Sequence, residues 1–92
     1  MPNTDFIGLI QSLVTTGEAA LGGYNALTAR MDRDGLERGR GTAERSLRLL
    51  EALAQKTRGN LDVDESEVLT DGIRALRDGL ESFDARAQGP QA

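Results

Sequence analysis

The stretch KTRGNL (residues 56–61) decides the fold, because it separates two runs of apolar residues with helical spacing. Leucines and alanines recur every three or four residues across 43–54. Leu, Ile and Phe then recur in alternating steps of four and three across 69–83. Two amphipathic helices joined by so short a connection must fold back on each other as an αα-hairpin. The sequence therefore predicts a helical hairpin over residues 42–84.

Individual residues of this turn have clear structural roles. Gly59 is expected to take the left-handed conformation that ends a helix, with Leu61 folding back on the last turn. Lys56 lies in that last turn, where a cation interacts favourably with the helix dipole. Asp62 and Glu65 have the spacing of a capping box, which starts the next helix. The predicted hairpin motif comprises Lys56, Thr57, Gly59, Asn60, Leu61 and Asp62.

A further amphipathic helix is predicted at residues 4–21, with Asn3 or Thr4 as its cap. Its apolar residues form two adjacent stripes, and together these make a face wider than one neighbouring helix can cover. Gly72 and Gly79, on the last helix, are easiest to explain if a neighbouring backbone packs close to them. We therefore predict an interface between helices or between subunits. Its candidate residues are Phe6, Ile7, Ile10, Leu13, Val14, Leu21, Gly72 and Gly79.

The remaining segments carry weaker patterns. Tyr24, Leu27 and Met31 have helical spacing, so a short helix is one interpretation of that region. Three glycines and alternating charges predict a mobile connector at residues 32–41. The tail, residues 85–92, is expected to fray.

Composition excludes several classes of function. The chain has 92 residues, which is enough for one small domain, and aromatic residues make up only 3%. It contains no cysteine and no histidine, which removes disulfides, thiolate nucleophiles and the usual zinc ligands. The net charge of −4 disfavours non-specific binding to nucleic acid. No basic segment precedes the first apolar stretch, and no apolar run approaches the roughly 20 residues that span a bilayer, so we expect a cytoplasmic protein.

Three charged clusters have some features of binding sites but are better explained by the architecture of the helices. Residues 56–60 hold two cations and a hydroxyl, but they lie at a helix C-terminus, whereas phosphate sites favour an N-terminus. The side-chain amide of Asn60 is expected to bridge the turn instead. The acidic residues from Asp62 to Glu67 lack the glycine and the bidentate glutamate of a calcium loop. The arginines alternate with acidic residues, which is typical of a solvated helix face; they are Arg30, Arg33, Arg38, Arg40, Arg45 and Arg48.

The sequence also resembles a known family. The span 43–77, with its KTRGNL turn, is similar to a family of small bacterial proteins known only as a domain of unknown function. Ser12-Leu13 and Leu21-Gly22 fit the N-terminal helix of that family. The resemblance covers nearly the whole chain except residues 23–41 and the tail. It implies an N-terminal helix followed by a helical hairpin, and it implies no activity.

Three positions depart from the family pattern. Asp62-Val63 stands where a Thr-Pro pair or a similar helix start is common. Gly72 replaces a large apolar residue, and Arg74 replaces what is often an aromatic residue. These departures concern the packing of the last helix.

Taken together, the sequence predicts an all-α protein: an N-terminal amphipathic helix plus an antiparallel αα-hairpin, completed by oligomerisation. We expect a non-enzymatic interaction or assembly module that forms a homodimer or higher oligomer and contacts a further, unidentified protein. The alternative is a peripheral membrane-associated factor anchored by residues 4–21, although that segment lacks the Lys and Arg of membrane-surface helices. We expect no cofactor, no metal and no nucleic-acid partner.

Overall fold

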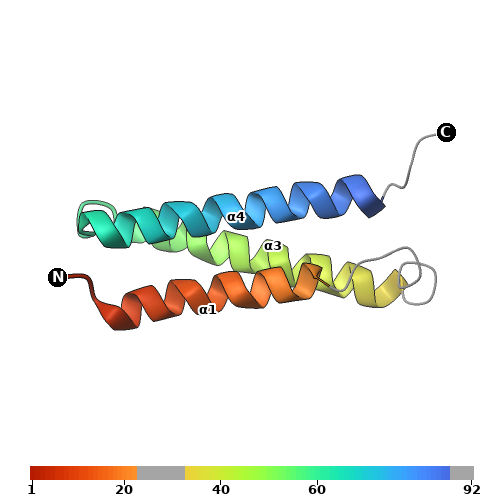
Figure 1. Ribbon diagram of the computed structural model, residues 1–92, viewed down its shortest axis with the longest axis horizontal. Coiled ribbons are helices and arrows are strands. Elements are labelled where there is room, and N and C mark those ends of the chain that lie inside the picture. Colours follow the sequence, from red (N-terminus) through yellow and green to blue (C-terminus); the bar gives the residue numbers. More distant parts are fainter. Residues whose placement is uncertain (23–32, 88–92) are drawn as a thin grey trace.

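A computed structural model describes residues 1–22 and 33–87, which form an all-α bundle of three packed helices. The helices are α1 (Thr4–Leu21), α3 (Arg33–Lys56) and α4 (Val63–Ala87). Figure 1 shows α3 running antiparallel to both α1 and α4, with α1 lying along the hairpin that α3 and α4 make. The predicted fold class and the hairpin are confirmed.

The N-terminal helix has the predicted bounds, and a side chain caps it. The Asn3 Oδ1 accepts a hydrogen bond of 2.9 Å from the Phe6 backbone N–H. This contact satisfies one of the backbone donors that a helix leaves unpaired in its first turn. At the other end, the Gly22 N–H donates to the Ala19 carbonyl and closes the helix.

The hairpin turn follows its predicted chemistry. Gly59 has φ +85°, the left-handed conformation that glycine adopts without a steric penalty. The capping box is reciprocal: the Glu65 N–H donates to the Asp62 Oδ1 at 2.8 Å, and the Asp62 N–H donates to the Glu65 Oε1 at 3.0 Å. One detail of the prediction is wrong. Asn60 closes the turn through its backbone N–H, which donates to the Thr57 carbonyl, and its side chain is exposed.

The core has two clusters, one towards each end of the bundle. Both contain residues of all three helices, so α1 is an integral part of the core. The cluster near the turn contains Ile10, Leu50, Leu69 and Leu76, and the other contains Leu21, Ala43, Leu80 and Phe83. Burying these side chains is the main favourable contribution to folding.

The predicted connector at residues 32–41 is wrong over its described part, because α3 already begins at Arg33. A Cβ atom added at Gly39 would lie 2.5 Å from the Ala20 carbonyl oxygen, so the backbones of α3 and α1 approach closely there. Leu36 packs against the second core cluster. These tertiary contacts offset the low helix propensity of the glycines.

The predicted tail differs in part from the structure. The helix α4 continues to Ala87, so residues 85–87 belong to it and not to a frayed tail. The remaining tail residues, 88–92, lie outside the described part of the chain, as do Asp32 and the helical pattern at Tyr24, Leu27 and Met31.

Candidate interaction surfaces

The candidate interface residues meet one another inside the chain, at the contact of α1 with the hairpin. A Cβ atom added at Gly72 would lie 2.8 Å from the Val14 Cγ2, and one at Gly79 would lie 3.3 Å from the Leu21 Cδ1. These glycines of α4 therefore make room for side chains of α1. The predicted close approach of a neighbouring backbone is wrong at both positions. Ile10 and Leu21 are buried.

The rest of that face is also used within the bundle. Phe6, Leu13 and Val14 are half-buried and pack against the core, and Ile7 is half-buried as well. The apolar face of α1 is wide because two helices, α3 and α4, cover it. A membrane could reach this face only if the bundle opened.

The end of the bundle at the hairpin turn has a polar link that the sequence did not reveal. The Glu65 Oε2 accepts a hydrogen bond of 2.8 Å from the backbone N–H of Asn3, while its other oxygen serves the capping box. Glu65 is only 8% exposed. One carboxylate thus starts α4 and also holds the beginning of α1. The capping box was visible in the sequence, but the link to Asn3 spans 62 residues and has no local signal.

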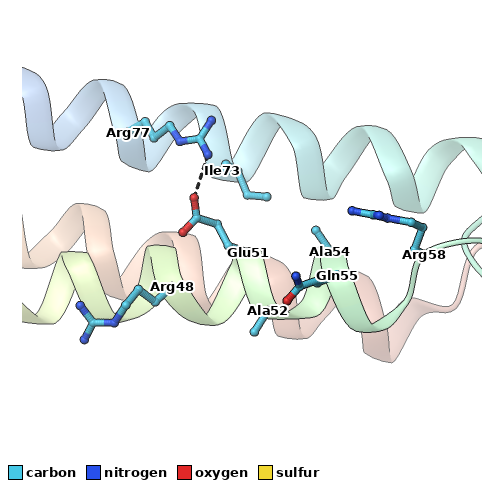
Figure 2. Close-up of a pocket in the computed structure, with 8 residues that line it drawn as sticks. All are labelled: Arg48, Glu51, Ala52, Ala54, Gln55, Arg58, Ile73 and Arg77. Carbon is cyan, nitrogen blue, oxygen red and sulfur yellow. Dashed lines mark hydrogen bonds and ion pairs between the residues drawn. The ribbon is translucent and has the colours of Figure 1, made fainter.

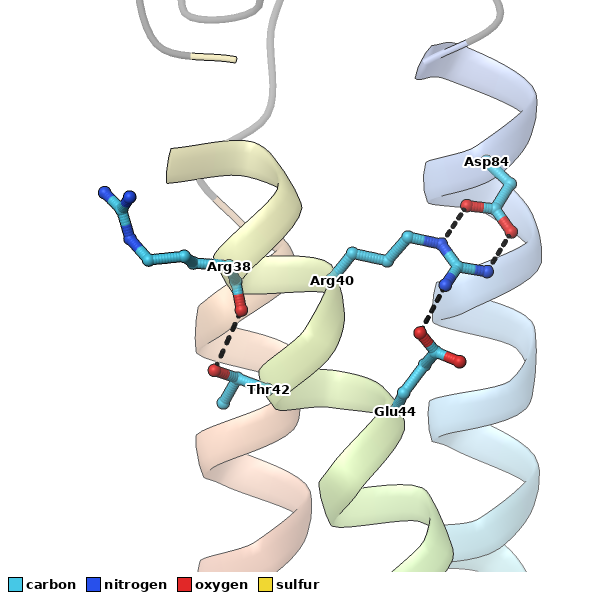
Figure 3. A network of polar contacts seen from close by, with 5 residues as sticks. All are labelled: Arg38, Arg40, Thr42, Glu44 and Asp84. Carbon is cyan, nitrogen blue, oxygen red and sulfur yellow. Dashed lines mark hydrogen bonds and ion pairs between the residues drawn. The ribbon is translucent and has the colours of Figure 1, made fainter. Parts of the chain in front are cut away.

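The opposite end has an arginine network (Figure 3). The guanidinium of Arg40 binds both carboxylate oxygens of Asp84, with Nε–Oδ1 at 2.6 Å and Nη2–Oδ2 at 2.8 Å. Its remaining nitrogen, Nη1, binds Glu44. The hydrogen bond from Arg40 lowers the pKa of Asp84, and the same bond raises the pKa of Arg40. The pair joins α3 to α4 and is half exposed.

A shallow groove of about 520 Å³ runs between α3 and α4 (Figure 2). We call it the hairpin groove. It is lined by Arg48, Glu51, Ala52, Ala54, Gln55, Arg58, Ile73 and Arg77. Across it, the Arg77 Nη2 binds the Glu51 Oε2 at 2.7 Å. A second depression continues the groove to the turn and adds the hydroxyl side chains of Thr57, Ser66 and Thr70.

The hairpin groove is locally basic in an acidic chain. Three arginines and one glutamate line it, and the glutamate is already paired with Arg77. Arg48 and Arg58 make no ion pair with any residue that the structure describes. Sequence reasoning grouped the arginines by their position along the chain. It therefore missed this set, which comes from two helices and the turn.

A second surface is apolar and lies where α1 meets α3. Leu9 and Leu49 are 47% and 41% exposed, and they stand on two adjacent helices. The two helices are level where Gly17 meets Ser46, since a Cβ atom at Gly17 would lie 3.2 Å from that of Ser46. Counting outward in antiparallel register brings Leu13 level with Leu50 and Leu9 level with Ala54, which directly follow Leu49 and Leu53 on α3. We call Leu9, Leu13, Leu49 and Leu53 the leucine patch.

Helical geometry places the two exposed leucines on the side of the bundle away from α4. Val14 faces Gly72 of α4, and Leu9 lies roughly 140° around α1 from Val14. Glu51 pairs with Arg77 of α4, and Leu49 lies roughly 160° around α3 from Glu51. The exposed leucines and the floor of the hairpin groove therefore point to different sides of α3, and Ala52 on the groove rim lies roughly 60° around α3 from Leu49.

The part of the chain that the structure describes lacks two features of a buried polar site: acidic side chains grouped to hold a metal ion and unpartnered buried polar atoms. Among residues 1–22 and 33–87, no group of three or more acidic side chains is placed to hold a metal ion. Every buried polar side-chain atom in these ranges has a hydrogen-bond partner. None of the three helices is long and apolar enough to cross a membrane.

Comparison with known proteins gives a family but no described activity. No curated protein matches the chain, and no solved structure matches it. A model of a family described as a domain of unknown function, DUF1844, matches residues 3–81. That match covers both the N-terminal helix and the hairpin, so the chain belongs to the DUF1844 family.

Proposed function

We propose that this protein is a non-enzymatic assembly module that forms a homodimer through the leucine patch. The observation that carries the proposal is the pair of exposed leucines, Leu9 and Leu49, on adjacent helices. Fully burying a large aliphatic side chain contributes about 1.5–3 kcal/mol, and roughly half of that is still to be gained at each of these two leucines. A partner that covers these two leucines would gain this stabilisation for the complex.

The surroundings of the patch favour a second copy of the chain as that partner. Asp5 lies one turn before Leu9 on α1, whereas Arg45 and Lys56 flank the leucines on α3. None of these three charges has an ion-pair partner among the described residues. One side of the patch is thus acidic and the other basic.

A two-fold axis would use both signs of charge. It would place α1 of one copy on α3 of its partner, so that Asp5 approaches Arg45 or Lys56 twice in the same interface. A stable interface buries about 800 Å² on each partner, more than four leucines provide. The contact would therefore extend over the neutral residues Ser12 and Thr16 of α1.

Related features remain part of the same proposal. We place the protein in the cytoplasm of a bacterium, in keeping with its lack of cysteine and with the family that it resembles. We also propose that residues 56–61 serve the family as its hairpin turn. The buried apolar face of α1 favours assembly over anchoring to a membrane.

The test is the molar mass in solution, measured by light scattering after size exclusion over a hundredfold range of protein concentration. We expect the mass of two subunits for the natural chain. The double variant Leu9→Gln/Leu49→Gln is expected to elute as a folded monomer, with its helicity checked by circular dichroism. Val63→Gln is the matched control, because Val63 is 72% exposed but lies at the start of α4, away from the patch.

Two results would overturn the proposal. One is a monomeric mass for the natural chain at every concentration. The other is a dimer that persists in the double leucine variant.

A further inference from the structure

We infer that the hairpin groove binds an acidic amphipathic helix of another protein. This inference does not rest on the leucine patch, because the groove floor and the exposed leucines point to different sides of α3 and use different chemistry. The groove combines an apolar floor with basic walls, and each part selects a property of the partner.

The floor consists of Ala54 and Ile73, whereas Ala52 is exposed and lines the outer rim on α3. Small side chains on α3 leave the depression between the two helices, and Ile73 of α4 is only half-buried within it. A leucine or another aliphatic side chain entering from outside would cover Ile73. An amphipathic helix presents such side chains in a stripe, which is how helices commonly bind to grooves between two other helices.

The walls determine the charge of the partner. Arg48 and Arg58 line the groove without an ion pair among the described residues, whereas Arg77 is engaged by Glu51. Figure 2 shows Arg58 reaching from the turn towards Ala54, while Arg48 extends from the side of α3 away from α4. A basic partner would meet two unpaired guanidinium groups, and an acidic one would pair with them.

The spacing of the two arginines favours a helix along the groove. Arg48 and Arg58 are ten residues apart in sequence, which corresponds to roughly 15 Å along α3 if helical rise is extended to the turn. A partner helix lying parallel to α3 would meet both with carboxylates about ten residues apart. Between them, its apolar stripe would cover Ile73 and Ala54. The complex would then resemble a four-helix bundle.

The experiment is a binding titration followed by fluorescence anisotropy, with the full chain and a labelled helical peptide. The probe is rich in Glu and Ala and carries a stripe of leucines, and the control peptide has Gln in place of every Glu. We expect the acidic peptide to bind about tenfold more tightly than the neutral one at low salt, with the difference shrinking as salt is added.

Two double variants assign the binding to the groove. Arg48→Gln/Arg58→Gln is expected to weaken binding of the acidic peptide about tenfold. Arg33→Gln/Arg38→Gln removes the same amount of charge from α3, outside the groove, and is expected to leave binding unchanged. Light scattering of each variant shows separately whether the dimer is intact, so loss of peptide binding and loss of assembly are distinguishable.

Three outcomes would overturn the inference. The acidic peptide does not bind, or the neutral peptide binds as tightly as the acidic one. The third is that the groove double variant and the control double variant weaken binding of the acidic peptide equally. Tighter binding to DNA or to vesicles containing phosphatidylserine, lost in the groove variant, would assign the groove to a phosphate-bearing partner instead.

Discussion

The two ends of the bundle are held by different kinds of interaction. At the turn end, Gly59, the capping box and the link from Glu65 to Asn3 satisfy backbone groups of the chain. At the opposite end, Gly39 lies against Ala20 and the Arg40–Asp84 pair joins α3 to α4. The turn end is fixed by a local turn and capping box plus one link across 62 residues, and the opposite end by contacts between residues 19 and 44 positions apart.

This difference shows what each end depends on. Caps and turns provide hydrogen-bond partners for backbone groups that would otherwise be unpaired. Their stabilising effect therefore depends mainly on the local sequence. A close approach of two backbones has value only when the third helix and the core bring those backbones together. Substitutions at the opposite end should therefore depend strongly on tertiary context.

The largest expected effect comes from one pair of glycines in α3. In Gly39→Ala, the new methyl group would lie 2.5 Å from the Ala20 carbonyl oxygen, so one helix must shift. In Gly41→Ala, the methyl group meets nothing within 4 Å and improves helix propensity. We expect the free energies of unfolding of the two variants to differ by about 2–3 kcal/mol, with opposite signs relative to the natural chain. Urea denaturation measures the free energy of unfolding of each variant. Equal stabilisation by Gly39→Ala and Gly41→Ala would contradict the close contact of α3 with Ala20.

The next effect concerns the turn end. Glu65→Ala removes the acceptor for both Asn3 and Asp62, leaving two backbone donors without it. We expect the free energy of unfolding to fall by about 1–2 kcal/mol. Glu67→Ala, exposed in the same turn of α4, is the control and should change it by less than about 0.5 kcal/mol. Similar losses in the two variants would show that only the charge near the helix start matters.

The smallest effect is expected at the arginine network. Both members of the Arg40–Asp84 pair are more than a third exposed, so Asp84→Asn should cost only about 0.5–1 kcal/mol near neutral pH. The folded-state pKa of Asp84 lies below its unfolded value. The ionised Asp84 carboxylate therefore stabilises the folded protein fully above its unfolded-state pKa of about 4. This stabilisation is lost as the pH falls through the folded-state pKa of Asp84. The gap between the natural chain and Asp84→Asn should narrow in acid and at about 1 M salt. A gap unchanged by pH would rule out the ion pair as its cause.

Sequence alone was sufficient where the controlling interactions are local. It determined the bounds of the first helix, the left-handed Gly59, the reciprocal Asp62–Glu65 capping box and the antiparallel hairpin. Each follows from residues within about one helical turn of one another, where residue type restricts the backbone directly. The apolar periodicity also showed that the first helix needs more than one neighbour.

Only the tertiary structure decided the remaining features. The glycines and charges at residues 33–41 favour a flexible segment by local propensity, yet contacts with Ala20, the second core cluster and Asp84 hold them as a helix. The wide face of α1 turned inward because both helices of the hairpin were available to cover it. The hairpin groove and the leucine patch likewise combine residues from separate segments. Local propensities amount to tenths of a kcal/mol per residue, whereas burial and close packing amount to several, so the long-range contacts determine the result.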